Sequence, residues 1–501
     1  MVSICCKQWC VFGTGTFFVL AAGILLIIWP SIFRSIIKDE LVLTNNSRSF
    51  DMWKETPIPM YLEIYLFNFS NYAEFKMDRK KIKPYFQECG PYIFSEKHFK
   101  TNLTWNNNND TITFMQNRIW QFEADMSNGT LEDKITNINV ITATVAYNLR
   151  FKHILIRHAV DFLLREKKEL LVITKTPREL LFDGYDDPII DMMEDLNVTT
   201  FNIPYNKFGW FYPRNDSSSY DGVFNMHTGV DKLKNLGKLY SWNYQNETKF
   251  YEKNSVCNMI NGTTGEIWPP FGKAKQLTLF ISDFCRSVTL NYAENYDKHG
   301  LVGRKYIGTE SVFDNGTAYP EASCFSNGEI LPSGVLNVSL CRMGAPAFVS
   351  YPHFYLADPV YRSNIDGMKP NKSLHEMFMA LEPNTGLPLE VRAQLQINIM
   401  IQDYEGISLF KDLQRTFVPM MWFRQTAELT GELADEAKTV VLIPMIGNYT
   451  FYGFGGIGFL IIAIGLYLSL SGAWMKKDEL LIKPNDDSTS HHEEYTPYHS
   501  S

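Results

Sequence analysis

The chain has 501 residues, of which 45% are hydrophobic and 14% aromatic, so it can build one large core or two ordinary ones and is not a disordered protein. Its formal net charge of -8 argues against a nucleic-acid binder, because binding to a phosphate backbone needs a concentrated positive field. Any anionic partner must therefore meet a local basic patch.

Two apolar segments lie at the two ends of the chain. The first, residues 11–30, holds no charged residue, and about 20 helical residues span the ~30 Å hydrocarbon layer of a bilayer. A cleavable signal peptide is the alternative for this segment, but no small-residue cleavage site follows Trp29. The second segment, residues 449–474, is also uncharged and is followed by Lys476 and Lys477.

These segments predict five parts. We expect a cytoplasmic tail at 1–10, a transmembrane helix at 11–30, an ectodomain at 31–448, a second transmembrane helix at 449–474 and a cytoplasmic tail at 475–501. The basic residues after the second span favour a cytoplasmic C-terminus.

Acceptor sequences for N-glycosylation support this topology, because every one of them lies between the two spans and neither tail has one. A segment so rich in acceptors is expected to face the secretory lumen, which leaves both termini in the cytosol. The predicted sites are Asn45, Asn68, Asn102, Asn109, Asn128, Asn197, Asn215, Asn246, Asn261, Asn315, Asn337, Asn371 and Asn448.

Cysteines are distributed in agreement with this placement. Cys5, Cys6 and Cys10 lie beside the first span on the predicted cytosolic side, where we predict palmitoylation rather than plain thiols. The ectodomain holds an odd number of cysteines, so that at most two disulfides form and one thiol is left over. We expect the distant Cys89 to be the odd one, fully buried and inert. The ectodomain cysteines are Cys89, Cys257, Cys285, Cys324 and Cys341.

Strand patterns dominate the ectodomain, which we expect to form one mainly antiparallel domain. In the run 394–402, Leu395, Ile397, Ile399 and Ile401 alternate with polar residues and Met400, which predicts a strand with one buried face. Two β-rich runs, 103–105 and 111–115, flank a turn-forming stretch and predict a hairpin.

Helical periodicity is concentrated at about 138–173. Phe151, Leu155, Ala159 and Phe162 recur at helical spacing and predict the buried stripe, while charged residues occupy another stripe. Most such charged stripes are solvated surface, but the basic excess here, in an acidic chain, makes this face the best candidate docking site. The candidate docking residues are Arg150, His153, Arg157, Arg165, Lys167 and Lys168.

Two segments look like a nucleotide-binding motif and a zinc motif but lack the features that these motifs need. Gly453, Gly455 and Gly458 spell a dinucleotide fingerprint but lie inside an apolar span, where glycines more often allow helices to pack closely. His375 and Glu376 begin a zinc motif, but Met379 stands in place of the second histidine. We therefore expect no enzyme, no cofactor and no metal.

Several collinear segments resemble the class B scavenger receptors. The matching segments include ECGPYIFSEKHFK at 88–100, RELLFDGYDDP at 178–188, FGWFYPRNDSSSYDGVF at 208–224, CNMINGTTGEIWPPF at 257–271, YPHFYLADP at 351–359 and VPMMWF at 418–423. That family includes the fatty-acid translocase, the high-density-lipoprotein receptor, the lysosomal integral membrane receptors and the insect croquemort-like receptors.

The resemblance implies an α+β membrane protein whose ectodomain is a large, irregular antiparallel β-barrel with an apolar tunnel and an apical helical bundle. By motif position it implies that Cys257 pairs with Cys324 and Cys285 with Cys341. A third family bridge is not expected, because Ser326 stands in place of its cysteine.

The function implied by the resemblance is that of a scavenger receptor, with endocytosis or lipid transport as the outcome. Lipids (fatty acids, sterols or phospholipids), lipoproteins, cell corpses or other anionic particles would dock on the apex, and lipid would pass through the tunnel to the membrane. We expect a multi-pass protein of the plasma membrane, with endosomal or lysosomal membranes as the alternative location and homo-oligomers as an open question. The alternative function is a two-span ligand-gated ion channel, a class that usually has more disulfides than five cysteines allow.

Overall fold

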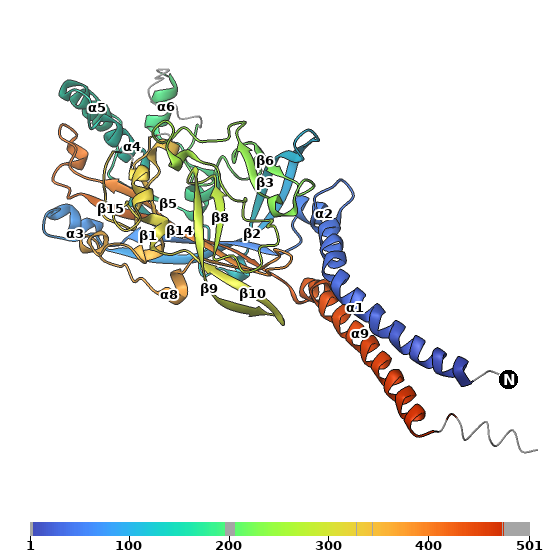
Figure 1. Cartoon of the computed structure of the whole chain (residues 1–501). Coiled ribbons are helices and arrows are strands. Elements are labelled where there is room, and N and C mark those ends of the chain that lie inside the picture. Colours follow the sequence, from blue (N-terminus) through green and yellow to red (C-terminus); the bar gives the residue numbers. More distant parts are fainter. Residues whose placement is uncertain (1–3, 196–205, 327, 343, 473, 475–501) are drawn as a thin grey trace, which may run out of the picture. The chain divides into compact units, whose positions relative to one another are not determined.

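The computed structural model describes residues 4–195, 206–326, 328–342, 344–472 and 474 (Figure 1). The chain forms two compact units: Met1–Ile36 with Thr439–Ser501, and Ile37–Lys438.

The first unit is built from the two terminal helices. Helices α1 (Ile4–Leu41) and α9 (Gly431–Leu470) are both long and apolar enough to cross a membrane. Their backbones come close at two glycines, because a Cβ on Gly15 would lie 3.0 Å from the Gly458 oxygen and one on Gly458 would lie 2.8 Å from the Gly15 oxygen. The motif glycine Gly458 thus packs helix on helix, as small residues do in membranes.

The second unit is dominated by one 13-stranded sheet whose named strands pair antiparallel. Its main path runs β7-β6-β3-β2-β1-β15-β14-β13-β10-β9-β8, and β12 joins β14 and β11 off this path. A separate two-stranded sheet pairs β4 with β5. The strands are β1 Met60–Phe69, β2 Phe86–Asn106, β3 Thr111–Phe122, β4 Ile135–Ile138, β5 Val172–Lys175, β6 Phe224–His227, β7 Leu239–Trp242, β8 Gln276–Ile281, β9 Arg286–Lys298, β10 Leu301–Ile307, β11 Leu336–Asn337, β12 Ala347–Ser350, β13 Phe378–Leu381, β14 Pro388–Ile401 and β15 Thr416–Glu428.

The two edge strands of the path are bridged, so that the sheet is nearly closed. Thr263 pairs with Lys238 beside β7 and with Leu279 on β8. Gly262 makes this approach: its φ is +86°, and an added Cβ would lie 2.0 Å from the Thr278 oxygen. Only glycine fits such a position, because it lacks a Cβ. The expected irregular antiparallel barrel is therefore confirmed, and with α1 and α9 it makes an α+β membrane protein.

The predicted hairpin is also confirmed. β2 and β3 are paired with Thr104 opposite Thr113 and Asn106 opposite Thr111. The turn between them ends at Asp110, whose φ is +52°, a conformation that aspartate tolerates better than most residues.

The prediction of one buried face for the strand at 394–402 was wrong, because β14 is buried on both faces. Gln394, Gln396 and Asn398 are all at most 1% exposed. Their amides are satisfied by the segment that covers this face: Gln396 Oε1 accepts from the His353 backbone N–H, at 2.7 Å, and Gln394 donates to the Glu376 carbonyl, at 2.7 Å. Buried amides need such partners to avoid a desolvation cost of ~1–3 kcal/mol each.

Short helices surround the sheet in the second unit. They are α2 Arg48–Lys54, α3 Tyr72–Met77, α4 Val140–Leu149, α5 Ile154–Glu166, α6 Pro188–Asp195, α7 Val360–Ser363 and α8 Lys372–His375. Helix α4 contacts both α5 and α6, and these three helices gather on the same side of this unit (Figure 1). They form the helical region expected at about 138–173, extended by α6.

Two disulfides hold the part of the second unit around β8, β9 and β11. Cys257 is bonded to Cys324 and Cys285 to Cys341, with Cα separations of 6.0 and 6.2 Å. These are the pairings that the resemblance implies. The remaining cysteine of this unit, Cys89, is only half-buried, so that its expected full burial was wrong. Burial nevertheless raises the pKa of the Cys89 thiol, which disfavours the reactive thiolate.

Candidate functional site

The candidate site is built on α4, a helix that is buried nearly all round. Asn139 begins it, because the Asn139 side chain accepts hydrogen bonds from the backbone N–H groups of Ile141 and Thr142. Such a cap satisfies donors that the first helical turn leaves unpaired. Helix α4 packs on β14 and fixes the position of the next helix, α5.

Helix α5 begins at His153, whose Nδ1 accepts from the Leu155 N–H at 3.3 Å. Lys167 follows its last residue, and Lys168 has a φ of +56°. A residue in this left-handed conformation commonly ends a helix.

The orientation of α5 is opposite to the one that the sequence predicted. The stripe expected in the core is exposed: Phe151 is 86% exposed, Leu155 70% and Phe162 60%. The helix instead turns Asp161 and Leu164 inward, at 4% and 2% exposure. The predicted assignment of buried and exposed faces was therefore wrong.

A loop that follows β14 explains this orientation. Asp161 Oδ1 accepts hydrogen bonds from Ser408 N, at 2.7 Å, and Ser408 Oγ, at 2.6 Å. Arg157 points to the same loop and pairs with Glu405 at 3.4 Å. Gly406 lies between them with a φ of +87°, where an added Cβ would meet the Ile154 side chain at 2.8 Å. The buried carboxylate thus replaces an apolar stripe as the anchor of α5.

The surface left outward, which we call the α5 face, combines apolar and basic side chains. Its apolar members are exposed by 48 to 86% and are Phe151, Leu155, Ile156, Phe162 and Leu170. Its basic members are exposed and are Lys152, His153, His158, Arg165, Lys167 and Lys168. In Figure 1 the helix projects at the outer border of this unit. Exposed apolar patches with polar rims mark interaction sites, and apolar residues beside Lys and Arg suit an anionic lipid surface.

Some of the predicted docking residues lie on the α5 face, and others lie beneath it and hold α5 in place. His153, Lys167 and Lys168 are exposed, and Arg165 is 66% exposed while paired with Asp161 at 2.9 Å. Arg150 is half-buried and lies over the rings of Tyr147 and Phe151, at 3.5 and 4.4 Å. Arg157 is only 14% exposed and supports α5 from within.

An acidic pair lies behind the α5 face. Burial, and secondarily the charge of Asp187, raise the pKa of Glu169 to about 7. Burial also raises the pKa of Asp187 itself. Asn139 Nδ2 donates to Glu169 Oε2 at 3.1 Å and so ties this carboxyl to the start of α4. The carboxyl of Glu169, beside the start of α4, therefore titrates near neutral pH.

A small apolar cavity lies between α4 and the barrel. It measures about 10 Å³ and is lined by side chains that include Leu66, Val140, Tyr185, Trp210 and Met420. This is room for about one water molecule, so the cavity in this form does not hold a lipid.

The predicted modification sites lie in varied surroundings. Cys6 and Cys10 are exposed, and the side chain of Cys5 and all of Asn197 lie outside the described residues. Most of the predicted glycosylation sites in the described part of the chain are exposed or half-buried. Asn337 differs, because it is 8% exposed and its Oδ1 accepts hydrogen bonds from Ser339 N and Oγ.

Within the residues that the structure describes, no group of three or more His, Cys, Asp or Glu side chains could hold a metal ion. His375 of the apparent zinc motif is buried and stacks on His353, with ring centroids 4.6 Å apart. Burial, with the charge of His353, lowers the pKa of His375 to about 4. His353 in turn pairs with Glu88 at 2.6 Å. Sequence reasoning missed this cluster, since its members are far apart in the chain.

Comparisons with known proteins agree on one family. The sequence pattern of the CD36 family matches residues 13–469. A Drosophila melanogaster protein named Protein peste is 36% identical over 86% of this chain and 77% of its own length. Scavenger receptor class B member 1 of Bos taurus is 32% identical over 90% of this chain and 87% of its own. Lysosome membrane protein 2 of Homo sapiens is 31% identical over 92% and 94%.

Proposed function

Because the chain belongs to the CD36 family, we propose that it is a scavenger receptor that docks lipid-bearing anionic particles on the α5 face and mediates their uptake. One relative, named a scavenger receptor, supports the receptor class, and another, named a lysosome membrane protein, supports the membrane location. The family match favours this function over a ligand-gated channel and over an enzyme.

The observation that carries the proposal is the exposure of large apolar side chains among basic ones on the α5 face. A water-facing Phe151 or Phe162 contributes little to the core, since 86% and 60% of these residues remain in solvent. Each gains free energy only when a partner covers it, by ~25 cal/mol per Å² of apolar area removed from water. Lipids, lipoproteins and cell corpses all present apolar surface together with anionic groups.

The rest of the predicted arrangement belongs to this proposal. Both termini are cytoplasmic, Cys5, Cys6 and Cys10 are palmitoylated and the ectodomain is glycosylated. The docked particle is internalised, or its lipid passes to the membrane through an apolar tunnel in the barrel. The apolar interior supports such a passage, but the cavity beneath α4, at about 10 Å³, must widen for it. The chain resides in the plasma membrane or in endosomal and lysosomal membranes.

Uptake by cells tests the proposal. Cells without a scavenger receptor of their own are made to express the full-length chain, and its surface amount is measured by antibody. They are then offered fluorescent vesicles of phosphatidylcholine with or without phosphatidylserine. We expect faster uptake of the anionic vesicles than by cells with an empty vector. Equal uptake at proven surface expression would refute the proposed function.

The same cells distinguish the receptor function from the alternative of a ligand-gated channel. A channel would produce a membrane current when the vesicles are applied, whereas a receptor would internalise them without one. Current without uptake would replace the present proposal by the channel alternative.

A further inference from the structure

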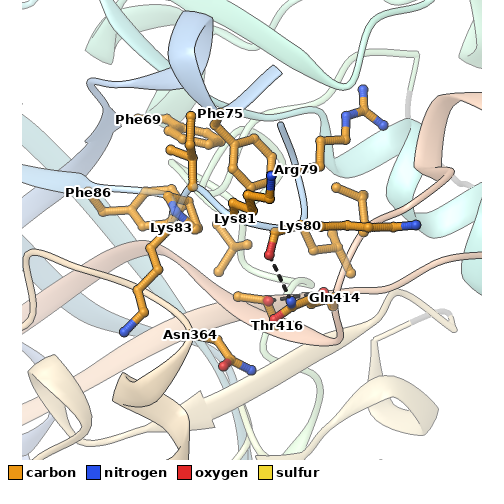
Figure 2. A pocket seen from close by; sticks show the side chains of 15 residues that line it. Phe69, Phe75, Arg79, Lys80, Lys81, Lys83, Phe86, Asn364, Gln414 and Thr416 are labelled. Atoms are coloured by element: carbon orange, nitrogen blue, oxygen red, sulfur yellow. Dashed lines mark hydrogen bonds between the residues drawn. The ribbon is translucent and has the colours of Figure 1, made fainter. Parts of the chain in front are cut away.

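A second, separate cavity in the ectodomain unit combines an apolar wall with a basic opening. It measures about 130 Å³ and lies where the end of β1, α3, the start of β2, the end of β14 and the start of β15 meet. Its apolar wall is made by Phe69, Phe75, Phe86, Ile401, Leu413 and Val418. All of these residues are at most 5% exposed. Figure 2 shows three of the rings grouped together with basic side chains around them.

The aromatic part of the wall is packed. The ring of Phe69 lies 5.4 Å from that of Phe75 and 4.8 Å from that of Phe86, measured between centroids. Such contacts hold the rings in place, so that the cavity is a feature of the folded wall. An engineered apolar cavity of about 150 Å³ holds benzene. A cavity of about 130 Å³ therefore accepts one narrow hydrocarbon segment and not the paired chains of a phospholipid.

The opening is lined by four basic residues of the loop between α3 and β2. Arg79 and Lys80 are tied to the loop after β14: Arg79 donates to the carbonyls of Leu409 and Lys411, both at 3.0 Å, and Lys80 pairs with Asp412 at 2.9 Å.

The other two basic residues are freer. The Lys81 side chain is 85% exposed and reaches Asp78 at 3.5 Å, and Lys83 is exposed and makes no ion pair with the described residues.

The charge at the opening selects the kind of anion. Five cations, Arg79, Lys80, Lys81, Lys83 and Lys411, lie around three carboxylates, Asp78, Asp403 and Asp412, which leaves an excess of two positive charges. A carboxylate supplies only one negative charge, whereas a phosphate monoester carries about -1.5 to -2 near pH 7. Lysine ammonium groups serve well as point charges for phosphate.

We propose that this cavity is a binding site for single-chain lipid phosphates, with the phosphate monoester among Lys81, Lys83 and their neighbours and the start of the chain against Phe69, Phe75 and Phe86. The site goes beyond the receptor function proposed above, because neither its cavity nor its basic loop belongs to the α5 face. Its ligand is a soluble or membrane-derived amphiphile and not a particle surface.

Short alkyl phosphates test the site without interference from bilayer partitioning. Isothermal titration on the full-length chain in phosphatidylcholine nanodiscs compares inorganic phosphate, butyl phosphate, hexyl phosphate and pentanoate. We expect affinity to rise about four-fold for each methylene that enters the cavity and then to level off for longer chains. Pentanoate should bind more weakly than butyl phosphate. Equal affinity of carboxylate and phosphate would overturn the assignment to phosphates.

Variants separate the two halves of the site. The double substitution Lys81→Gln and Lys83→Gln should weaken the binding of hexyl phosphate about 2- to 30-fold, as expected for two exposed ion contacts. The matched control, Lys249→Gln with Lys253→Gln, removes two exposed charges elsewhere and should leave the affinity for hexyl phosphate unchanged.

Val418→Ile adds one methylene at the apolar wall and should reduce the gain in affinity per methylene of the ligand, while inorganic phosphate binds as before. Unchanged hexyl phosphate binding by the Lys81 and Lys83 variant would refute the site. If the affinity did not depend on chain length, the cavity would not hold the alkyl chain, and the proposed lipid site would be refuted.

Discussion

Removing the exposed rings of the α5 face should abolish much of the docking while leaving the fold intact. The perturbation is the double substitution Phe151→Ser with Phe162→Ser. The two residues are 86% and 60% exposed, so their loss should change the free energy of unfolding by no more than ~0.5 kcal/mol each.

The expected loss in binding follows from the same exposed fractions. Complete burial of a phenylalanine is worth ~1.5–3 kcal/mol. Since 86% of Phe151 and 60% of Phe162 remain to be covered, each ring contributes about 1 to 2.5 kcal/mol if a lipid surface covers it fully. The double variant should therefore bind at least about 30-fold more weakly.

Surface plasmon resonance measures this directly. The full-length chain in phosphatidylcholine nanodiscs is immobilised, and vesicles containing phosphatidylserine are passed over it at several salt concentrations. Ile330→Ser serves as the matched control, because Ile330 is 77% exposed and lies outside the α5 face. A second variant, Lys152→Gln with Lys167→Gln, removes charge and no ring.

The two variants should differ in their response to salt. Loss of the rings should weaken binding at every salt concentration, whereas loss of the lysines should flatten the salt dependence, because exposed charges are screened. If the ring variant binds like the wild type and only the lysine variant fails, docking is electrostatic alone and the reasoning about exposed rings is refuted.

Three further outcomes follow from the structure. Acidification should stabilise the segment that holds α4 and α5, because the pKa of Glu169 is raised to about 7 in the folded chain. The protonated carboxyl therefore adds to the free energy of unfolding only below pH 7. This addition grows as the pH falls towards the unfolded pKa of ~4.3 and reaches about 1–2 kcal/mol after allowing for partial exposure. The hydrogen-exchange protection factors of α4 and α5, which correct for the intrinsic pH dependence of exchange, should rise between pH 8 and 5 in the wild type and stay level in Glu169→Gln. Asp161→Ala should leave the Ser408 N–H unpaired and cost about 1–3 kcal/mol, seen as faster exchange in α5; a rate equal to the wild type would contradict the anchoring role. Mass spectrometry of the glycosylated chain should find Asn337 unmodified, because it is 8% exposed and bonded to Ser339; full occupancy there would show that this segment opens.

Elements of the fold were predictable where the physical signal is local and strong. The uncharged run at 11–30 and residues 449–470 of the second run lie in helices long enough to cross a membrane, and the hairpin of β2 and β3 follows from two β-rich runs around a turn. In both cases neighbouring residues determine the outcome.

The orientation of α5 was not predictable from periodicity, because two stripes of different composition competed for the core. The rule that apolar residues face inward selects Phe151 and Phe162. The helix instead follows Asp161, whose hydrogen bonds to Ser408 span 247 residues of sequence. A partner so distant leaves no mark on the local pattern. Functional sites are the places where such local rules fail.

The prediction that only one face of β14 is buried was wrong for a related reason. Gln396 and Asn398 have the spacing of a solvent-facing stripe, but the segment around His353 covers them and satisfies their amides. The pairing of Glu88 with His353 was hidden in the same way, since 265 residues separate them. Alternation predicts a strand, but it does not show what lies on its polar face.

Contact between lipid surfaces and the α5 face can be detected by site-specific photo-crosslinking, with a photoreactive amino acid placed at Phe162 in one full-length variant and at Ile330 in another. After illumination with vesicles that carry labelled phospholipid, we expect label on the chain modified at Phe162 and only background at Ile330. Equal labelling at both positions, or none at Phe162 while the vesicles remain bound, would contradict it.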